Sequence, residues 1–134
     1  MHTKLRLLAS ALLPAVKSSA LVQTLLIFGL VPLNQIFNVA ATVGFANSGM
    51  AGSASCFLFW QVVGSLFGFG TQITFAGMVH FFSLRIANAV GIGLAFFSAQ
   101  FFGAYLYFHE PFTPAQWAGT ALLFLGILLI ALGR

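Results

Sequence analysis

Charged side chains are nearly absent from this chain. Among its 134 residues only 4% are charged, comprising five Lys or Arg residues and a single acid, Glu110. A soluble domain carries roughly 25% charged residues, because its surface must meet water. Six charged side chains cannot cover a soluble particle of this size, so lipid must be the main solvent for the outside of the molecule.

The scarcity of reactive side chains also limits the chemistry. A single cysteine, Cys56, excludes an internal disulfide and any multi-cysteine metal site. The sequence offers no acid–base pair, no metal constellation and no activated nucleophile. The basic residues are scattered singly, so none of them forms a patch that could follow phosphates. We therefore expect that the protein is not an enzyme and that it has no cofactor, no metal site and no nucleic-acid partner.

What the chain has in abundance is hydrophobic sequence, which makes up 60% of it. Spanning the hydrocarbon takes about 20 apolar residues in a helix, and four stretches qualify: 21–45, 55–79, 86–108 and 115–132. The fourth has a marked start, with Thr113 as N-cap, Pro114 at the first helical position and Gln116 completing a capping box. Short connections force neighbouring helices to run antiparallel. The sequence predicts an all-α integral membrane protein, a single domain over 1–134 with four transmembrane helices in an up-down bundle.

The first 19 residues allow two interpretations. Lys4 and Arg6 followed by the apolar stretch 7–16 are typical of a signal peptide. However, Lys17 fits poorly in a cleavage region, and the first span begins immediately at Leu21. We favour an uncleaved, short N-terminal interfacial helix that lies on the membrane.

The positions of the basic residues predict an orientation. With a cytoplasmic N-terminus, all five fall on the cytoplasmic side: Lys4, Arg6, Lys17, Arg85 and Arg134. The positive-inside rule then gives an N-in, C-in protein, which we expect in a bacterial inner (plasma) membrane. Aromatic residues typical of an interfacial belt fall near the opposite ends of the helices: Trp60, Tyr105, Tyr107 and Trp117.

Polar side chains inside the spans indicate where function lies. Asn34, Asn38 and Thr42 are spaced by four and Gln35 stands beside them, so the first helix carries one polar stripe. Gln61, Ser65 and Gln72 share a face of the second helix, and Asn88 begins the third. These residues either line a polar path or hydrogen-bond between helices, at about 0.6–2 kcal/mol for each bond. Both interpretations stay open for the first-helix stripe.

Glycines mark faces on which helices can approach closely. Gly64 and Gly68 form a GxxxG pair in the second span, and Gly119 and Gly126 leave a smooth stripe on the fourth. A chain this small cannot enclose a pathway alone. We therefore expect these four glycines to pack helices or oligomer contacts.

Two segments carry a family resemblance. The first is Ala87–Ala95, with alternating small residues, and the second runs from Phe108 through Glu110, Gln116 and Gly119 to Gly126. Both resemble the small multidrug resistance proteins and the wider drug/metabolite transporter superfamily, whose small members are four-helix chains. The resemblance implies a dimerisation role for Gly119 and Gly126.

The same comparison shows departures from that family. The essential glutamate of its first helix falls near Asn38, or one turn earlier at Gln35, and the aromatic positions of its binding chamber fall on Asn88 and Gly91. This chain therefore lacks the residue that couples export to protons and the aromatic side chains that bind aromatic cations in that family. Relatives without the glutamate include paired subunits that flip polyprenyl-phosphate-linked sugars. The resemblance therefore permits a lipid-linked molecule as the substrate of this chain.

Two functions follow as expectations. The first is a transport or flippase subunit whose path lies at a chain–chain interface and is lined by Asn34, Gln35, Asn38, Gln61 and Asn88. The alternative is an accessory subunit of a larger membrane complex that transports nothing. The expected partners are membrane lipids and another membrane chain, either a different protein or a parallel copy, because one-sided loop charge disfavours an antiparallel pair.

Overall fold

A computed structural model describes residues 20–133 of the chain. Over this range every element of secondary structure is a helix. The expected interfacial helix, with Lys4, Arg6 and Lys17, lies outside the described residues, and so does Arg134.

The first two spans form a long antiparallel pair. Helix α2 covers Ala20–Gly49 and continues through Pro32, and helix α3 covers Ala54–Phe81. Ser53 caps α3, because its hydroxyl oxygen accepts a hydrogen bond from the amide of Cys56 at 3.3 Å. The small polar residues between the helices thus end one span and start the next.

The third span is a continuous helix with two π-helical stretches. It consists of α4 (Leu84–Ala87), η1 (Asn88–Gly93), α5 (Leu94–Ser98) and η2 (Ala99–Tyr107). The span also ends in a π-turn, because the amide of Phe108 donates to the carbonyl of Gly103, five residues earlier, at 3.0 Å. A π-turn holds more residues than an α-turn, so side chains after it point to different sides than an α-helical spacing predicts.

The fourth span is α6, Pro114–Leu132, and its predicted capping box is confirmed. The Gln116 amide nitrogen donates to Thr113 Oγ1 at 3.3 Å, and the Thr113 amide donates to Gln116 Oε1 at 2.8 Å. The preceding connection includes His109 at φ 55°, a left-handed conformation that turns the chain back toward α6.

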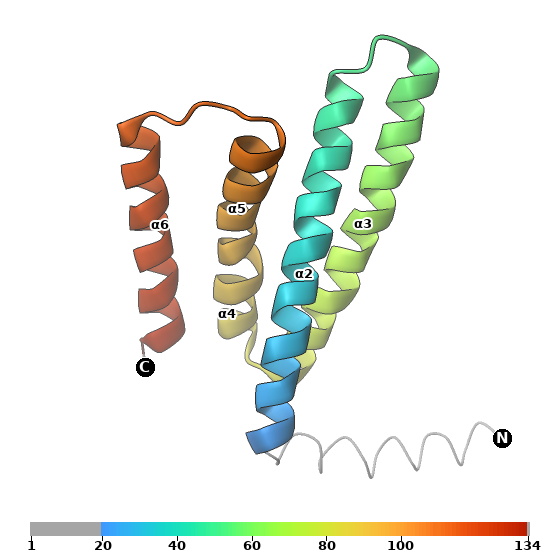
Figure 1. Cartoon of the computed structure of the whole chain (residues 1–134). Helices are drawn as coiled ribbons and strands as arrows, with labels where there is room; N and C mark the ends of the chain where they lie inside the picture. The colour runs from blue at the N-terminus through green and yellow to red at the C-terminus, as the bar shows by residue number, and fades with distance from the viewer. Residues whose placement is uncertain (1–19, 134) are drawn as a thin grey trace, which may run out of the picture.

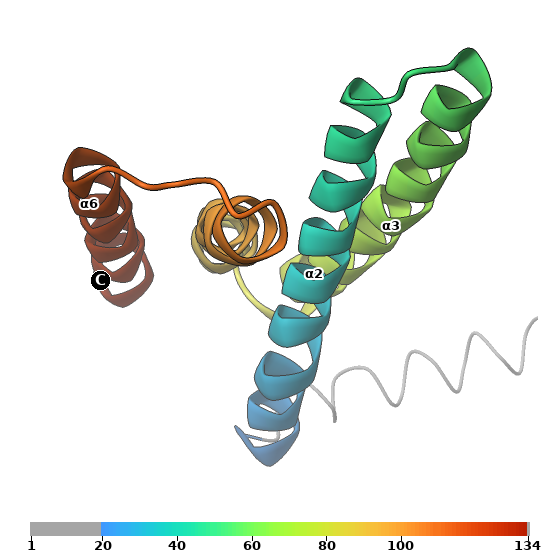
Figure 2. The same cartoon turned by 45° about the horizontal axis from the view of Figure 1, so that its top comes forward.

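The helices alternate in direction, as expected from the short connections (Figure 1). The connections 50–53 and 108–113 lie at one end of the molecule, and connection 82–83 lies at the other, together with the end of α6. Figure 2 shows α6 beyond the third span and away from the α2–α3 pair. The four spans therefore form an open row rather than a closed ring.

The backbones of α2 and α3 approach each other closely. A Cβ atom added at Gly44 would lie 2.7 Å from the Gly64 Cα atom, and one added at Gly64 would lie 2.7 Å from the Phe45 ring. Gly64, one of the predicted packing glycines, therefore does lie at a helix contact. Its predicted partner Gly68 does not, because a Cβ there would have no neighbouring atom within 4 Å.

Helix α6 is joined to the third span mainly by apolar and aromatic side chains. Ile127 is 7% exposed and packs on Gly93, where a Cβ would lie 2.6 Å from its side chain. Near the connection 108–113, the Trp117 ring lies 5.5 Å from that of Tyr105 and 5.2 Å from that of Phe112. These edge-on and tilted ring pairs hold the start of α6 in place.

The helix lengths agree with a membrane protein. Three helices, over Thr24–Gly49, Ala54–Phe81 and Leu84–Tyr107, are long and apolar enough to cross a membrane, and Pro114–Ile130 is a shorter apolar helix. Large apolar side chains such as Phe28, Leu66 and Leu129 are about three-quarters to two-thirds exposed. The helical, membrane-compatible fold class is thus observed at the four predicted positions.

Candidate functional site

The most buried polar side chain of the described region is Asn34, only 1% exposed. Its Nδ2 atom donates to the Thr71 carbonyl and to Thr74 Oγ1, both at 2.9 Å. The Thr74 hydroxyl in turn lies 2.9 Å from the Gly70 carbonyl, as a donor. Asn34 therefore fastens α2 to α3 by hydrogen bonds that are shielded from lipid.

Gln35 makes the equivalent connection from α2 to the third span. Its Nε2 atom donates to the Gly91 carbonyl at 3.3 Å and to Asn34 Oδ1 at 3.2 Å. Its Oε1 atom accepts from Ser98 Oγ at 2.8 Å. The side-chain nitrogen and oxygen atoms of both amides are thus hydrogen-bonded within the chain, and both amides hold three helices together.

Beside this network lies a groove of about 220 Å³ between α2, α3 and the third span, here called the central groove. Two of its lining residues, Asn38 and Gln72, have carboxamide side chains, and Phe75 and Ile92 are among its apolar lining residues. The residues that line it are Asn34, Asn38, Thr71, Gln72, Phe75, Gly91, Ile92 and Ala95.

The two carboxamides of the central groove differ from the network behind it. The nitrogen and the oxygen of the Asn34 carboxamide are both hydrogen-bonded. Neither Asn38 nor Gln72 makes a side-chain hydrogen bond within residues 20–133. Asn38 is half-buried and Gln72 is exposed. An amide left unpaired in lipid costs several kcal/mol, so these groups call for a hydrogen-bonding partner from outside the described chain.

The other two predicted path residues lie elsewhere. Gln61 accepts a hydrogen bond at its Oε1 atom from Ser48 Oγ at 3.1 Å, near the connection between α2 and α3. Asn88 is exposed at the start of η1, and it does not line the central groove. Of the five predicted residues, Asn34 and Asn38 line one groove, and Gln35 is hydrogen-bonded to Asn34 without lining it.

Sequence reasoning missed several residues of this region. The Thr71 carbonyl and the Thr74 hydroxyl accept hydrogen bonds from Asn34. The Gly91 carbonyl accepts one from Gln35. Only the Thr74 hydroxyl had a side-chain signal, as a polar group in an apolar helix, because Asn34 bonds Thr71 through its backbone carbonyl. The backbone acceptor at Gly91 had no side-chain signal at all.

The glycines of α6 face open space. A Cβ atom at Gly119 or Gly126 would have no other atom within 4 Å. The predicted smooth stripe therefore lies on the surface of this chain, where another molecule can reach it.

Within the same described range, no group of three or more His, Cys, Asp or Glu residues is placed to hold a metal ion. No family model, no curated protein and no solved structure matches this chain.

Proposed function

We propose that this chain is a membrane transport subunit that moves a polar or lipid-linked molecule along the central groove. The observation that carries the proposal is a pair of groove-lining residues, Asn38 and Gln72, whose carboxamides have no hydrogen-bond partner in residues 20–133. Both lie well inside membrane-length helices, since Asn38 is 11 residues before the end of α2 at Gly49. Roughly 16 Å of helix separates it from that end.

A passing polar group supplies the hydrogen bonds that lipid cannot. In the proposal, carboxamides bind such a group weakly enough to release it, because they are neutral and hold no countercharge. The resemblance to small multidrug resistance proteins supports transport, and the amide in place of their glutamate argues for movement without proton coupling through this position. The path is completed by a second chain, since one open row of helices leaves the groove uncovered.

Reconstituted liposomes test the proposal. Fluorescently labelled glycolipids and phospholipids are placed in both leaflets, and the fraction that dithionite can bleach reports their movement. We expect Asn38→Leu to abolish movement of the transported lipid while expression and assembly size stay unchanged. Asn88→Leu is the matched control, because Asn88 lies outside the groove and makes no side-chain hydrogen bond in the described chain.

Loss of the Asn38→Leu protein from the membrane would instead make this residue structural. A wild-type protein that moves none of these lipids, with or without a co-purifying partner chain, would remove the lipid version of the proposal.

The accessory-subunit alternative has its own supporting observation. The buried Asn34 and the half-buried Gln35 both make side-chain hydrogen bonds to neighbouring helices, as in a chain built only to pack. Purification in mild detergent separates the two functions. Stoichiometric recovery with a large complex, whose activity tolerates Asn38→Leu, would favour the accessory role.

A further inference from the structure

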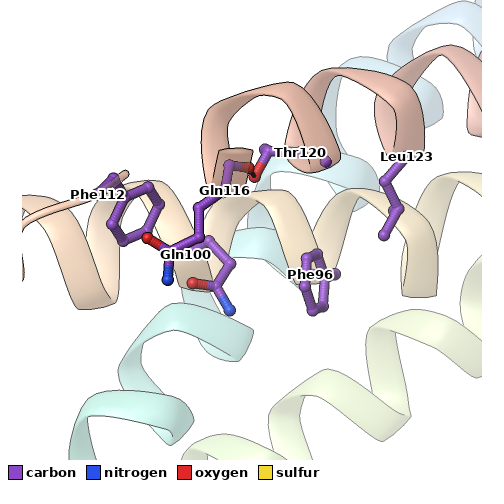
Figure 3. Close-up of a pocket in the computed structure, with 7 residues that line it drawn as sticks. Phe96, Gln100, Phe112, Gln116, Thr120 and Leu123 are labelled. Atoms are coloured by element: carbon purple, nitrogen blue, oxygen red, sulfur yellow. Dashed lines mark hydrogen bonds between the residues drawn. The ribbon is translucent and has the colours of Figure 1, made fainter. Parts of the chain in front are cut away.

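A second cavity lies between the third span and α6, on the far side of the molecule from α3. It measures about 320 Å³ and is here called the α6 pocket. Figure 3 shows the side chains of Gln100 and Gln116 reaching into it from the two helices, with Phe112 at one end and Leu123 at the other. The lining residues are Phe96, Gln100, Phe112, Gln116, Gly119, Thr120 and Leu123.

The capping box fixes what Gln116 can offer to this pocket. Its Oε1 atom already accepts from the Thr113 amide at 2.8 Å and from Thr113 Oγ1 at 3.0 Å. Its Nε2 atom makes no hydrogen bond in the described chain. The side chain is therefore held by its oxygen and presents two free N–H donors.

Gln100 adds a second unpaired group. Its carboxamide is half-buried and has no hydrogen-bond partner among the described residues. No charged side chain lines the pocket. Because donors are in excess and no charge is present, the site complements a neutral hydrogen-bond acceptor, such as a carbonyl, better than an ion.

The aromatic residues beside the pocket are typical of the depth at which membranes supply such carbonyls. Gln116 is in the first turn of α6, and the neighbouring Trp117 ring lies 5.5 Å from that of Tyr105. Trp and Tyr gather at the membrane–water interface. The ester groups of glycerolipids lie in this layer, between the head groups and the acyl chains. Toward the middle of α6, Phe96 and Leu123 give the pocket apolar walls suited to an acyl chain.

Gly119 keeps the pocket open. A Cβ at this position would meet no atom within 4 Å, so the space beside it is empty in the chain itself. A larger residue would project into the space between the two glutamines and Leu123 without straining the helix. Gly119 is therefore a position at which the pocket can be filled by substitution.

We propose that the α6 pocket binds a membrane glycerolipid through its ester carbonyls. Gln116 Nε2 and the Gln100 carboxamide donate to the carbonyl oxygens, and one acyl chain lies along Phe96 and Leu123. The head group stays at the surface beside the connection 108–113. This site is separate from the central groove, and it does not depend on whether the chain transports anything.

The test compares diester phosphatidylcholine with its diether analogue, which has the same head group and chains but no carbonyl oxygens. Native mass spectrometry of the full chain in mild detergent measures binding of each lipid. One hydrogen bond is worth about 0.5–1.5 kcal/mol net, so we expect the diester to bind the wild-type chain about two- to twelvefold more tightly for each bond. Equal binding of the two lipids would overturn the proposal.

Gln116→Glu isolates the donor. A glutamate at this position keeps the Thr113 capping box but replaces the Nε2 donor with an oxygen. We expect this variant to keep its helix content and to lose most of the preference for the diester. An unchanged preference would show that Gln116 does not hold the carbonyl.

Gly119→Leu fills the pocket and should abolish binding of both lipids at this site. Gly68→Leu is the matched control, since a Cβ at Gly68 on α3 also meets no atom within 4 Å, and it should bind as the wild type does. The same spectra report the number of chains in each assembly. If Gly119→Leu releases a second copy of the chain but retains the lipid, the pocket is a chain–chain contact and the lipid proposal is wrong.

Discussion

Replacement of Gly44 by alanine tests the close backbone contact between α2 and α3. An alanine Cβ at this position would lie 2.7 Å from the Gly64 Cα atom and 2.8 Å from the Gly64 nitrogen. Ordinary van der Waals contact begins at 3.4 Å. Both obstructing atoms belong to the backbone of α3, so neither can rotate away. Helices α2 and α3 must therefore separate by roughly 0.7–1 Å, which loosens the packing beside the contact.

The expected magnitude follows from two opposing effects. Overpacking of a close contact typically costs about 1–3 kcal/mol. Alanine also favours helix over glycine by up to about 1 kcal/mol, which offsets part of this loss. We expect Gly44→Ala to lower the free energy of unfolding by about 1–2 kcal/mol. Gly64→Ala should cost less, because its Cβ would mainly meet the Phe45 ring, a side chain that can move.

The measurement is reversible unfolding in mixed micelles with an increasing fraction of dodecyl sulfate, followed by tryptophan fluorescence. Trp60 is a local reporter, since its carbonyl oxygen lies 3.5 Å from the position of the added Cβ. Gly68→Ala is the control, because its Cβ meets nothing within 4 Å and should leave stability unchanged or slightly raised. Equal stability of Gly44→Ala and Gly68→Ala, within about 0.5 kcal/mol, would refute the close approach of α2 and α3.

Three further predictions concern the network, the orientation and the assembly. Asn34→Leu removes two hydrogen bonds to α3 and should destabilise the chain by about 1–3 kcal/mol in the same titration, with Asn88→Leu close to wild type; a wild-type value for Asn34→Leu would mean that these bonds contribute nothing. A reporter fused after Arg134 should read cytoplasmic, and one inserted at 49–53 should read external, whereas equal signals from both sides would show dual topology. Gly126→Leu should reduce the assembly size measured by light scattering in mild detergent, because its open surface then no longer admits a partner helix; an unchanged size would place the contact elsewhere.

The helix positions were predictable from the sequence because lipid imposes a strong constraint. Every spanning backbone must satisfy its own hydrogen bonds, so apolar length and the small polar breaks between spans determine where helices start and end. The start of α6 was predictable in atomic detail, since the Thr113–Gln116 capping box depends only on local sequence. The predicted spans 21–45 and 55–79 are each extended by a few residues in α2 and α3.

The distribution of the polar residues was not predictable in the same way. Asn34 and Asn38 are four apart, so they differ by about 40° around α2 and share one stripe. Because of that difference, the Asn34 side chain lies in the contact between α2 and α3, whereas Asn38 lies at the groove. Whether Asn34 or Asn38 has all its hydrogen bonds depends on where α3 lies, and no local sequence pattern contains that information.

The third span shows a second limit. The sequence suggests a regular helix over 86–108, on which Asn88 could face the same path as Asn34. Asn88 lies exposed at the first residue of η1, and the π-helical stretches η1 and η2 change the angular spacing of the residues that follow it. Gly44 was missed for a related reason, because a lone glycine has no spacing signal until its partner Gly64 on the neighbouring helix is known.

The open row of helices determines what can cover the central groove. All of its lining residues come from α2, α3, η1 and α5, and none comes from α6. The fourth helix contacts the third span instead, so residues 20–133 supply no cover for Asn38 and Gln72. Lipid acyl chains could cover the groove only by leaving both carboxamides unpaired, at several kcal/mol each. A surface that carries hydrogen-bonding groups avoids that cost, which favours a second chain, or the transported molecule itself, over lipid as the missing wall.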